Sequence, residues 1–113
     1  MNIMTQPDKW VIIKIDNGTP GEEVYKVYGS WMGGYLDGDA WRLNSGITKV
    51  GFDEDMFIFT GYSGSSYHCY YKSYGVGTSY TSGVLDSIIK RGEEAGYTIT
   101  IMPEDTDWLN LLK

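Results

Sequence analysis

The residue types best suited to chemistry gather in one short stretch, "GYSGSSYHCYYKSYG" (61–75), which holds five of the ten tyrosines, the only histidine and the only cysteine. Adjacent side chains on a strand point to opposite faces, so His68 cannot act as a base for Cys69 unless the strand is bulged there. A Ser-His-Asp arrangement would have only His68 as its base, and the chain has no G-x-S-x-G motif. We therefore predict no catalytic residue and a protein that is not an enzyme, with catalysis by His68 as the remote alternative.

Metal and carboxylate chemistry find little support in the residue types. Asp37 and Asp39 in "LDGDAW" form the closest acidic pair, but Asp-Gly is common in turns and the later glutamate of a calcium loop is missing. With one histidine and one cysteine, the chain cannot build a zinc site of the usual Cys/His kind. We predict no metal and no cofactor.

A small anionic ligand is suggested by "YGVGTSYTSG" (74–83), which lies between a predicted strand and a predicted helix. Backbone N–H groups and hydroxyls of this turn would surround a phosphate at the helix N-terminus, while tyrosines stack on a nucleotide base. The run departs from G-x-G-x-x-G because Tyr80 replaces the third glycine, and a plain capped loop is the competing interpretation. The candidate ligand-binding residues are Tyr62, His68, Lys72, Gly75, Gly77, Thr78, Ser79 and Tyr80.

A second candidate surface is "YGSWMGGYLDGDAW" (28–41), a glycine-rich segment with large aromatic side chains of the kind that supply interface hot spots. Core packing is the alternative, and we expect Trp41 and Leu36 to be structural. Strand alternation in 67–74 also predicts a solvent-exposed aromatic face that includes Tyr70 and Tyr74, opposite a buried face with Tyr67, Cys69 and Tyr71. The candidate partner-binding residues are Trp31, Met32, Tyr35, Tyr70 and Tyr74.

Three β-rich regions must position these residues. "WVIIKI" (10–15) and "EVYKVYG" (23–29) flank strong turn residues and predict a hairpin. "ITKVGF" (47–52) and "MFIFT" (56–60) flank an acidic turn and predict a second hairpin, and "YHCYYKSY" (67–74) returns as a further strand. Because "MFIFT" is apolar on both faces, we expect it to be a central strand with the helix on one side.

The main helix is predicted over "SGVLDSIIKRGEEA" (82–95), capped by Thr81 or Ser82 and ending before Gly96. Gly92 is expected to weaken its last turn. "YTITI" (97–101) follows as a strand, and "EDTDWLNLLK" (104–113) as a short terminal helix. The fold class is therefore α+β: a mostly antiparallel sheet of five to six strands, with one main helix packed on a face, in a single domain spanning 1–113.

The charge balance excludes one large class of partner. Nine basic and 15 acidic residues give a net charge of −6, which opposes binding to the phosphate backbone of nucleic acid. The acids are scattered, which indicates a solvated acidic surface instead of a nucleic-acid mimic. The N-terminal residues lack a basic leader, and no run approaches the roughly 18 apolar residues of a membrane helix. We predict a cytoplasmic protein without membrane contact.

The order of "KWVIIKI", "VYKVYGSWMGGYLDGDAWRLNSGI", "FTGYSGS" and "PEDTDWLNLL" resembles small accessory proteins of tailed bacteriophages. This resemblance supplies no catalytic residues; it implies a compact accessory protein that binds and inhibits a host protein or sequesters a host signal. Our first hypothesis is an inhibitor of a host protein, such as a component of antiviral defence, in the host cytoplasm. The acidic charge would speed encounter with a basic partner. The alternative function is sequestration of a nucleotide-type signal, and a homodimer through the aromatic segment stays open.

Overall fold

The computed structural model describes residues 4–33 and 38–113, so that Tyr35 and Leu36, two residues of the predicted aromatic surface, lie outside the described residues. The elements are β1 (Met4–Thr5), β2 (Lys9–Asp16), β3 (Val24–Trp31), β4 (Ala40–Leu43), β5 (Ile47–Asp53), β6 (Met56–Gly61), β7 (Ser66–Tyr70), α2 (Ser79–Glu94), β8 (Thr98–Ile101) and the 3-10 turn η1 (Trp108–Asn110). The α+β class is confirmed, and η1 stands where the short terminal helix was predicted.

The strands form two sheets instead of the single sheet expected. The helix-bearing sheet has the order β4-β3-β2-β8, and the second sheet has the order β1-β7-β6-β5. The pairings are antiparallel except that of β1 with β7. Both predicted hairpins are confirmed: β2 pairs with β3 and β5 with β6.

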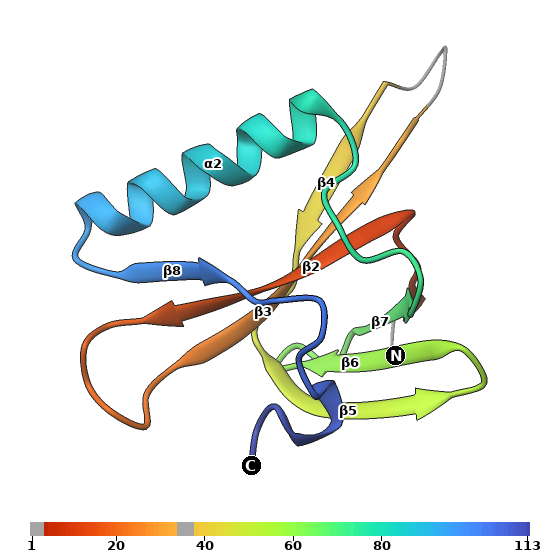
Figure 1. Cartoon of the computed structure of the whole chain (residues 1–113), viewed down its shortest axis with the longest axis horizontal. Coiled ribbons are helices and arrows are strands. Elements are labelled where there is room, and N and C mark those ends of the chain that lie inside the picture. The colour runs from red at the N-terminus through yellow and green to blue at the C-terminus, as the bar shows by residue number, and fades with distance from the viewer. Residues whose placement is uncertain (1–3, 34–37) are drawn as a thin grey trace.

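Strands β2 and β3 lie between α2 and the second sheet and supply buried residues to both cores, whereas the "MFIFT" strand β6 does not lie under α2. Alternate side chains of β2 enter different cores: Trp10 and Ile12 face the second sheet, whereas Val11 and Ile13 face α2. In Figure 1, α2 lies on one side of β2 and β8, and β5 and β6 lie on the other. The expectation that α2 packs on β6 is therefore wrong. Four consecutive buried apolar residues in β2 supply both cores, which is typical of a strand between two layers.

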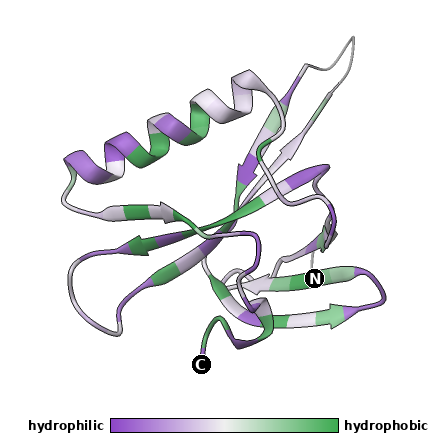
Figure 2. Cartoon of the chain, viewed as in Figure 1, coloured by the Kyte–Doolittle hydropathy of each residue, from purple (hydrophilic) through white to green (hydrophobic). Residues whose placement is uncertain are grey.

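The helix begins earlier than its apolar pattern indicated. Its N-cap is Thr78, whose hydroxyl accepts from the backbone N–H of Thr81, while the Thr81 hydroxyl accepts from the Thr78 N–H in a capping box. Thr81 is therefore an interior partner of the cap and not the cap itself. At the other end Gly96 has φ +95°, which confirms its predicted role after the last turn. Hydrophilic and hydrophobic bands alternate along α2 (Figure 2), as its amphipathic pattern requires.

Gly92 has a packing role and does not simply weaken the last turn. A Cβ atom at this position would overlap the side chain of Ile99 in β8. The missing side chain lets α2 approach the sheet closely, and Ile99 joins the core that α2 covers. The helix continues past Gly92 to Glu94.

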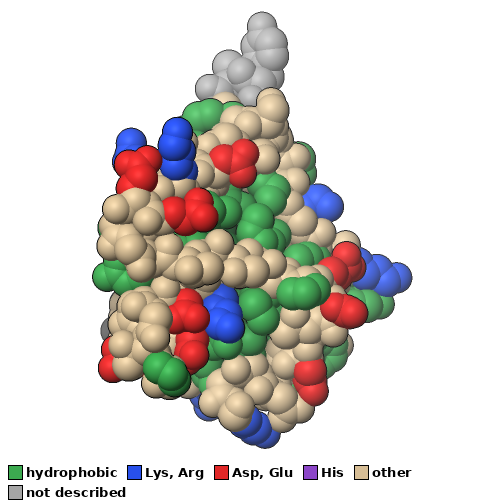
Figure 3. Space-filling view, turned by 60° about the vertical axis from the view of Figure 1, so that its left-hand side comes forward, with side chains coloured by type: hydrophobic (Ala, Val, Ile, Leu, Met, Phe, Trp, Pro, Cys, Tyr) green, Lys and Arg blue, Asp and Glu red, His purple; other side chains and the backbone are tan. Residues whose placement is uncertain are grey.

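Large hydrophobic side chains are also exposed. On the face shown in Figure 3 they form a broken band between acidic and basic side chains. In the part of the chain that the structure describes, the exposed large hydrophobic residues are Met32, Trp41, Phe52, Tyr62, Tyr71, Tyr80, Tyr97, Ile101, Leu109 and Leu112.

Within residues 4–33 and 38–113, no helix is long and apolar enough to cross a membrane.

Candidate functional site

Strand β7 separates His68 from Cys69, as its alternation predicted. Cys69 is fully buried and pairs with Phe57 of β6, whereas His68 lies partly exposed on the opposite face, with its Nε2 3.3 Å from the Ser66 hydroxyl. The register of β6 and β7 is continuous at Cys69, so no bulge turns the two side chains toward each other. Burial raises the pKa of the Cys69 thiol, which keeps it protonated and unreactive at neutral pH.

Tyr74 is a structural residue and does not belong to the exposed aromatic face. Strand β7 ends at Tyr70, so the alternation no longer holds at Tyr71 and Tyr74. The Tyr74 hydroxyl accepts from the backbone N–H of Ile12, 3.2 Å away, and donates to the Met102 carbonyl. Its ring meets that of Trp10 edge-on at 4.8 Å. Tyr71, which we expected in the core, is exposed instead.

The remaining aromatic and partner-binding candidates differ in how exposed their side chains are and in the contacts that these side chains already make. The Trp31 indole donates to the Gln6 carbonyl at 2.9 Å and lies against Gly29, so it holds the N-terminal segment in place. Met32 is half exposed. Tyr70 lies partly exposed at the end of β7, beside Tyr71. Trp41 stacks on Tyr28 with ring centroids 5.8 Å apart, yet it keeps an exposed side.

The candidate ligand-binding residues are not brought together into one site. Tyr62 lies in the β6–β7 turn, whereas Lys72 follows the opposite end of β7. The Thr78 hydroxyl is used by the helix cap, with Ser79 as the first helical residue. Gly75 donates its N–H to the Trp10 carbonyl, Gly77 packs against Ser30, and Tyr80 is exposed on α2.

An open hollow of about 560 Å³ lies at the end of the second sheet where β5 turns into β6 and β7 ends. We call it the acidic hollow. Trp108 belongs to its wall and is anchored by edge-on contacts with Trp10 and Phe59 at 5.6 and 6.3 Å. The backbone N–H of Tyr71 donates to the Asp55 carbonyl, which joins the hollow to the β5–β6 turn. Its lining residues are Phe57, Tyr71, Glu104, Asp105, Thr106 and Trp108.

The acidic hollow combines aromatic rings with carboxylates. Glu104 and Asp105 line it directly, and the acidic turn 53–55 is joined to it through Tyr71. The ammonium group of Lys72 lies 5.5 Å from the centroid of the Tyr71 ring, so this ring already attracts a cation. Such an arrangement is suited to a lysine or arginine side chain from another molecule.

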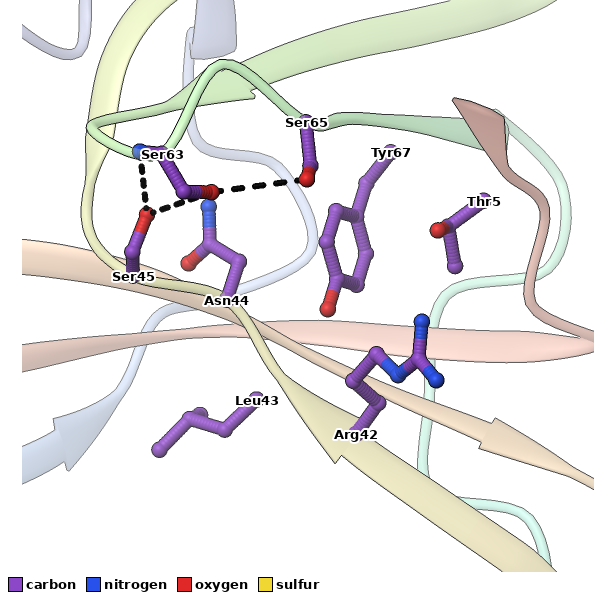
Figure 4. Close-up of a pocket in the computed structure, with 8 residues that line it drawn as sticks. All are labelled: Thr5, Arg42, Leu43, Asn44, Ser45, Ser63, Ser65 and Tyr67. Atoms are coloured by element: carbon purple, nitrogen blue, oxygen red, sulfur yellow. Dashed lines mark hydrogen bonds between the residues drawn. The ribbon is translucent and has the colours of Figure 1, made fainter. Parts of the chain in front are cut away.

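A second, smaller pocket of about 260 Å³ lies at the opposite end of the second sheet, between the β4–β5 connection and the β6–β7 turn. We call it the polar pocket; Figure 4 shows its lining. Pairing of Ile47 with Gly61 brings the two turns together, and Ser63 donates its backbone N–H to the Ser45 hydroxyl at 3.0 Å. A Cβ atom on Gly61 would lie 2.7 Å from the Ser45 oxygen, so glycine makes room there. The lining residues are Thr5, Arg42, Leu43, Asn44, Ser45, Ser63, Ser65 and Tyr67.

Sequence reasoning missed the polar pocket. "NSG" (44–46) and "SGSS" (63–66) are typical turn sequences, and nothing in either one indicates that it meets the other. Arg42 lies four residues before Gly46, and no motif around it indicates a binding role. In the fold, burial raises the pKa of Tyr67 and the nearby Arg42 guanidinium partly offsets that rise, so the cation lies close to the phenol.

Comparison of the chain with protein-family models, curated protein sequences and solved structures gives no match. Among residues 4–33 and 38–113, no group of three or more His, Cys, Asp or Glu side chains is placed to hold a metal ion.

Proposed function

We propose that this protein is a non-enzymatic binder that inhibits a host protein, and that the partner inserts a basic segment into the acidic hollow. The observation that carries the proposal is the combination of exposed Tyr71, the deeper Trp108 ring and the carboxylates of Glu104 and Asp105 around one opening. A guanidinium or ammonium group gains both from an aromatic face and from a nearby negative charge.

The charge of the whole chain supports the same kind of partner. At −6, the protein attracts a basic surface at long range, which raises the rate of encounter. Aromatic side chains then supply most of the short-range binding energy at a typical interface. Lys72, which already lies over the Tyr71 ring, is the group that an incoming cation would displace.

The resemblance to accessory proteins of tailed bacteriophages supports a host protein as this partner. The class of target that we propose is a component of antiviral defence in the host cytoplasm. Inhibition would follow if the basic segment that enters the acidic hollow is one that the target needs for its own activity.

The first experiment measures binding of a lysine- and arginine-rich nonapeptide by isothermal titration calorimetry, against the same peptide with glutamine at every basic position. We expect only the basic peptide to bind, with affinity that falls as salt is raised. Tyr71→Ala and the double variant E104Q/D105N should each weaken binding about threefold to tenfold. The matched control, E93Q/E94Q, removes the same charge from the exposed end of α2.

Two results would contradict the proposal. Equal weakening by the two double variants would show that diffuse charge, and not the acidic hollow, attracts the peptide. Failure of the basic peptide to bind the natural chain at low salt would remove the basic partner altogether.

The alternative function, sequestration of a nucleotide-type signal, loses the site that its residues suggested. The helix cap uses the Thr78 hydroxyl, and Lys72 lies at the far end of β7 from Tyr62. The ring of Tyr62 can still stack on a nucleotide base, because this residue is 72% exposed in the turn that borders the polar pocket. We therefore expect a phosphate-bearing ligand to use that pocket.

A further inference from the structure

One buried polar group in the polar pocket has no partner. Asn44 is only 5% exposed, and its side-chain oxygen accepts from the backbone N–H of Val27 at 2.9 Å. The Asn44 backbone N–H donates to the Val27 carbonyl at 3.0 Å. Because Val27 presents a donor to the side chain, the amide must face it with oxygen, and its nitrogen must face the other way.

That nitrogen is directed at the serine-lined side of the pocket (Figure 4). Among the buried side-chain nitrogen and oxygen atoms of the described residues, Asn44 Nδ2 is the one that has no hydrogen-bond partner. A buried donor left without an acceptor costs roughly 1–3 kcal/mol, so native proteins rarely retain one. An acceptor supplied by a ligand would remove this cost.

The other groups around the opening also suit an anion. The Arg42 side chain extends from β4 toward the space beside Tyr67 and Thr5 (Figure 4). The Ser63 hydroxyl donates to the Ser65 hydroxyl, which leaves Ser65 with a hydroxyl donor at the turn. None of the eight lining residues is acidic, although the chain as a whole has 15 acidic residues and nine basic ones. The pocket is thus a local collection of donors with one exposed cation, Arg42, in an acidic protein.

We infer that the polar pocket binds a phosphate-type oxyanion, with Asn44 Nδ2 and the Arg42 guanidinium as its main donors. At about 260 Å³ the pocket is slightly smaller than the roughly 300–1,000 Å³ of typical small-molecule sites, which suits one phosphate group. That phosphate is either free or the terminal group of a small metabolite. In the second case, the exposed ring of Tyr62, which packs against Gly46 beside the pocket, offers a stacking surface for a base.

The test follows the side-chain NH₂ signals of Asn44 by NMR during titration with sodium phosphate at pH 7 and constant ionic strength. We expect saturable shifts of these signals with phosphate and none with chloride. Arg42→Gln should weaken phosphate binding about tenfold or more, because it removes a charge-assisted contact. Arg91→Gln removes the other arginine of the chain from the exposed surface of α2 and should change nothing.

Asn44→Asp tests the role of the free Asn44 donor most directly. It keeps an oxygen for the Val27 N–H but replaces the free donor with a negative oxygen, so binding should be lost. If this variant fails to fold, Arg42→Gln against Arg91→Gln decides the matter alone. Shifts that do not saturate, or that chloride reproduces, would overturn the inference, as would equal weakening by the two arginine variants.

A parallel titration with adenosine monophosphate separates the two sources of the phosphate. Tighter binding of the nucleotide than of free phosphate, lost in Tyr62→Ala, would assign the site to a phosphorylated metabolite. Equal affinities, unchanged in Tyr62→Ala, would assign it to free phosphate. Either result supports the oxyanion site.

Discussion

The tyrosine side chains fall into two chemical groups that the fold separates. The Tyr28 hydroxyl donates to the Thr81 carbonyl at 2.7 Å beneath α2, and the Tyr74 hydroxyl joins β2 to the segment after β8. Burial raises the pKa of both phenols to about 12, because the charged phenolate would lose its hydration. Tyr62, Tyr71 and Tyr80 are exposed to solvent.

At this scale we predict a steep loss of stability in alkaline solution. The two buried phenols have a folded pKa near 12 against a reference value of 10.0, so folding favours their protonated form. Their contribution is complete below pH 10 and is lost as the pH rises from 10 to 12. Urea unfolding at pH 9 to 12, followed by tryptophan fluorescence, should show the midpoint falling across that range.

Tyr74→Phe tests the same point with one residue. The variant should be less stable than the natural chain at pH 8, since the Ile12 N–H and the Met102 carbonyl lose their partner, but it should lose less stability between pH 10 and 12. Tyr97→Phe, at an exposed position, is the control. If phenolate absorbance instead showed all tyrosines of the folded protein ionising together near pH 10, the buried environment of these two would be wrong.

Helix α2 contains two glycines in very different surroundings. Gly83 is exposed, and a Cβ there would meet nothing within 4 Å. Gly92 faces Ile99, whose side chain would overlap such a Cβ. The same residue type therefore serves close packing at one position and contributes no packing at the other.

This contrast predicts opposite effects of one substitution on the free energy of unfolding. Gly83→Ala should raise it by about 1 kcal/mol, the usual difference in helix propensity. Gly92→Ala should lower it by up to about 2 kcal/mol, because overpacking against Ile99 costs about 1–3 kcal/mol and the propensity gain returns about 1 kcal/mol. Chemical denaturation followed by circular dichroism measures both, and stabilisation by Gly92→Ala would show that α2 does not approach β8 this closely.

On the scale of the whole molecule, β2 links two hydrophobic cores. Ile12 packs in the core between the two sheets, whereas Ile13 packs in the core beneath α2, and both are fully buried. Because adjacent residues of one strand belong to different cores, neither core can lose its share of β2 without disturbing the other.

Cooperative unfolding of both layers is therefore expected. Ile12→Ala and Ile13→Ala should each lower the free energy of unfolding by about 2–5 kcal/mol. In each variant, the far-ultraviolet signal of α2 and the near-ultraviolet signal of the buried tryptophans should change at the same denaturant concentration. Earlier loss of the helix signal in Ile13→Ala alone would indicate two independent layers.

Local patterns were sufficient for several elements. The β2–β3 and β5–β6 hairpins, the opposite faces of His68 and Cys69 and the position of Gly96 all follow from side-chain periodicity and turn chemistry. These depend on residues close together in the chain. Tyr74 shows the limit of this reasoning. The alternation of side chains between the two faces of β7 ends with the strand at Tyr70, so it does not predict where Tyr74 lies.

The amino-acid sequence by itself determined the α+β class, the main hairpins and the acidic charge, because each depends on composition or on neighbouring residues. Only the tertiary structure decided that α2 covers β2, that Tyr71, Trp108 and Glu104 line one hollow, and that Arg42, Asn44 and Ser65 line one pocket. The physical reason is long-range strand pairing. The register of β5 with β6 brings two unremarkable turns together, and neither turn carries any local mark of the other.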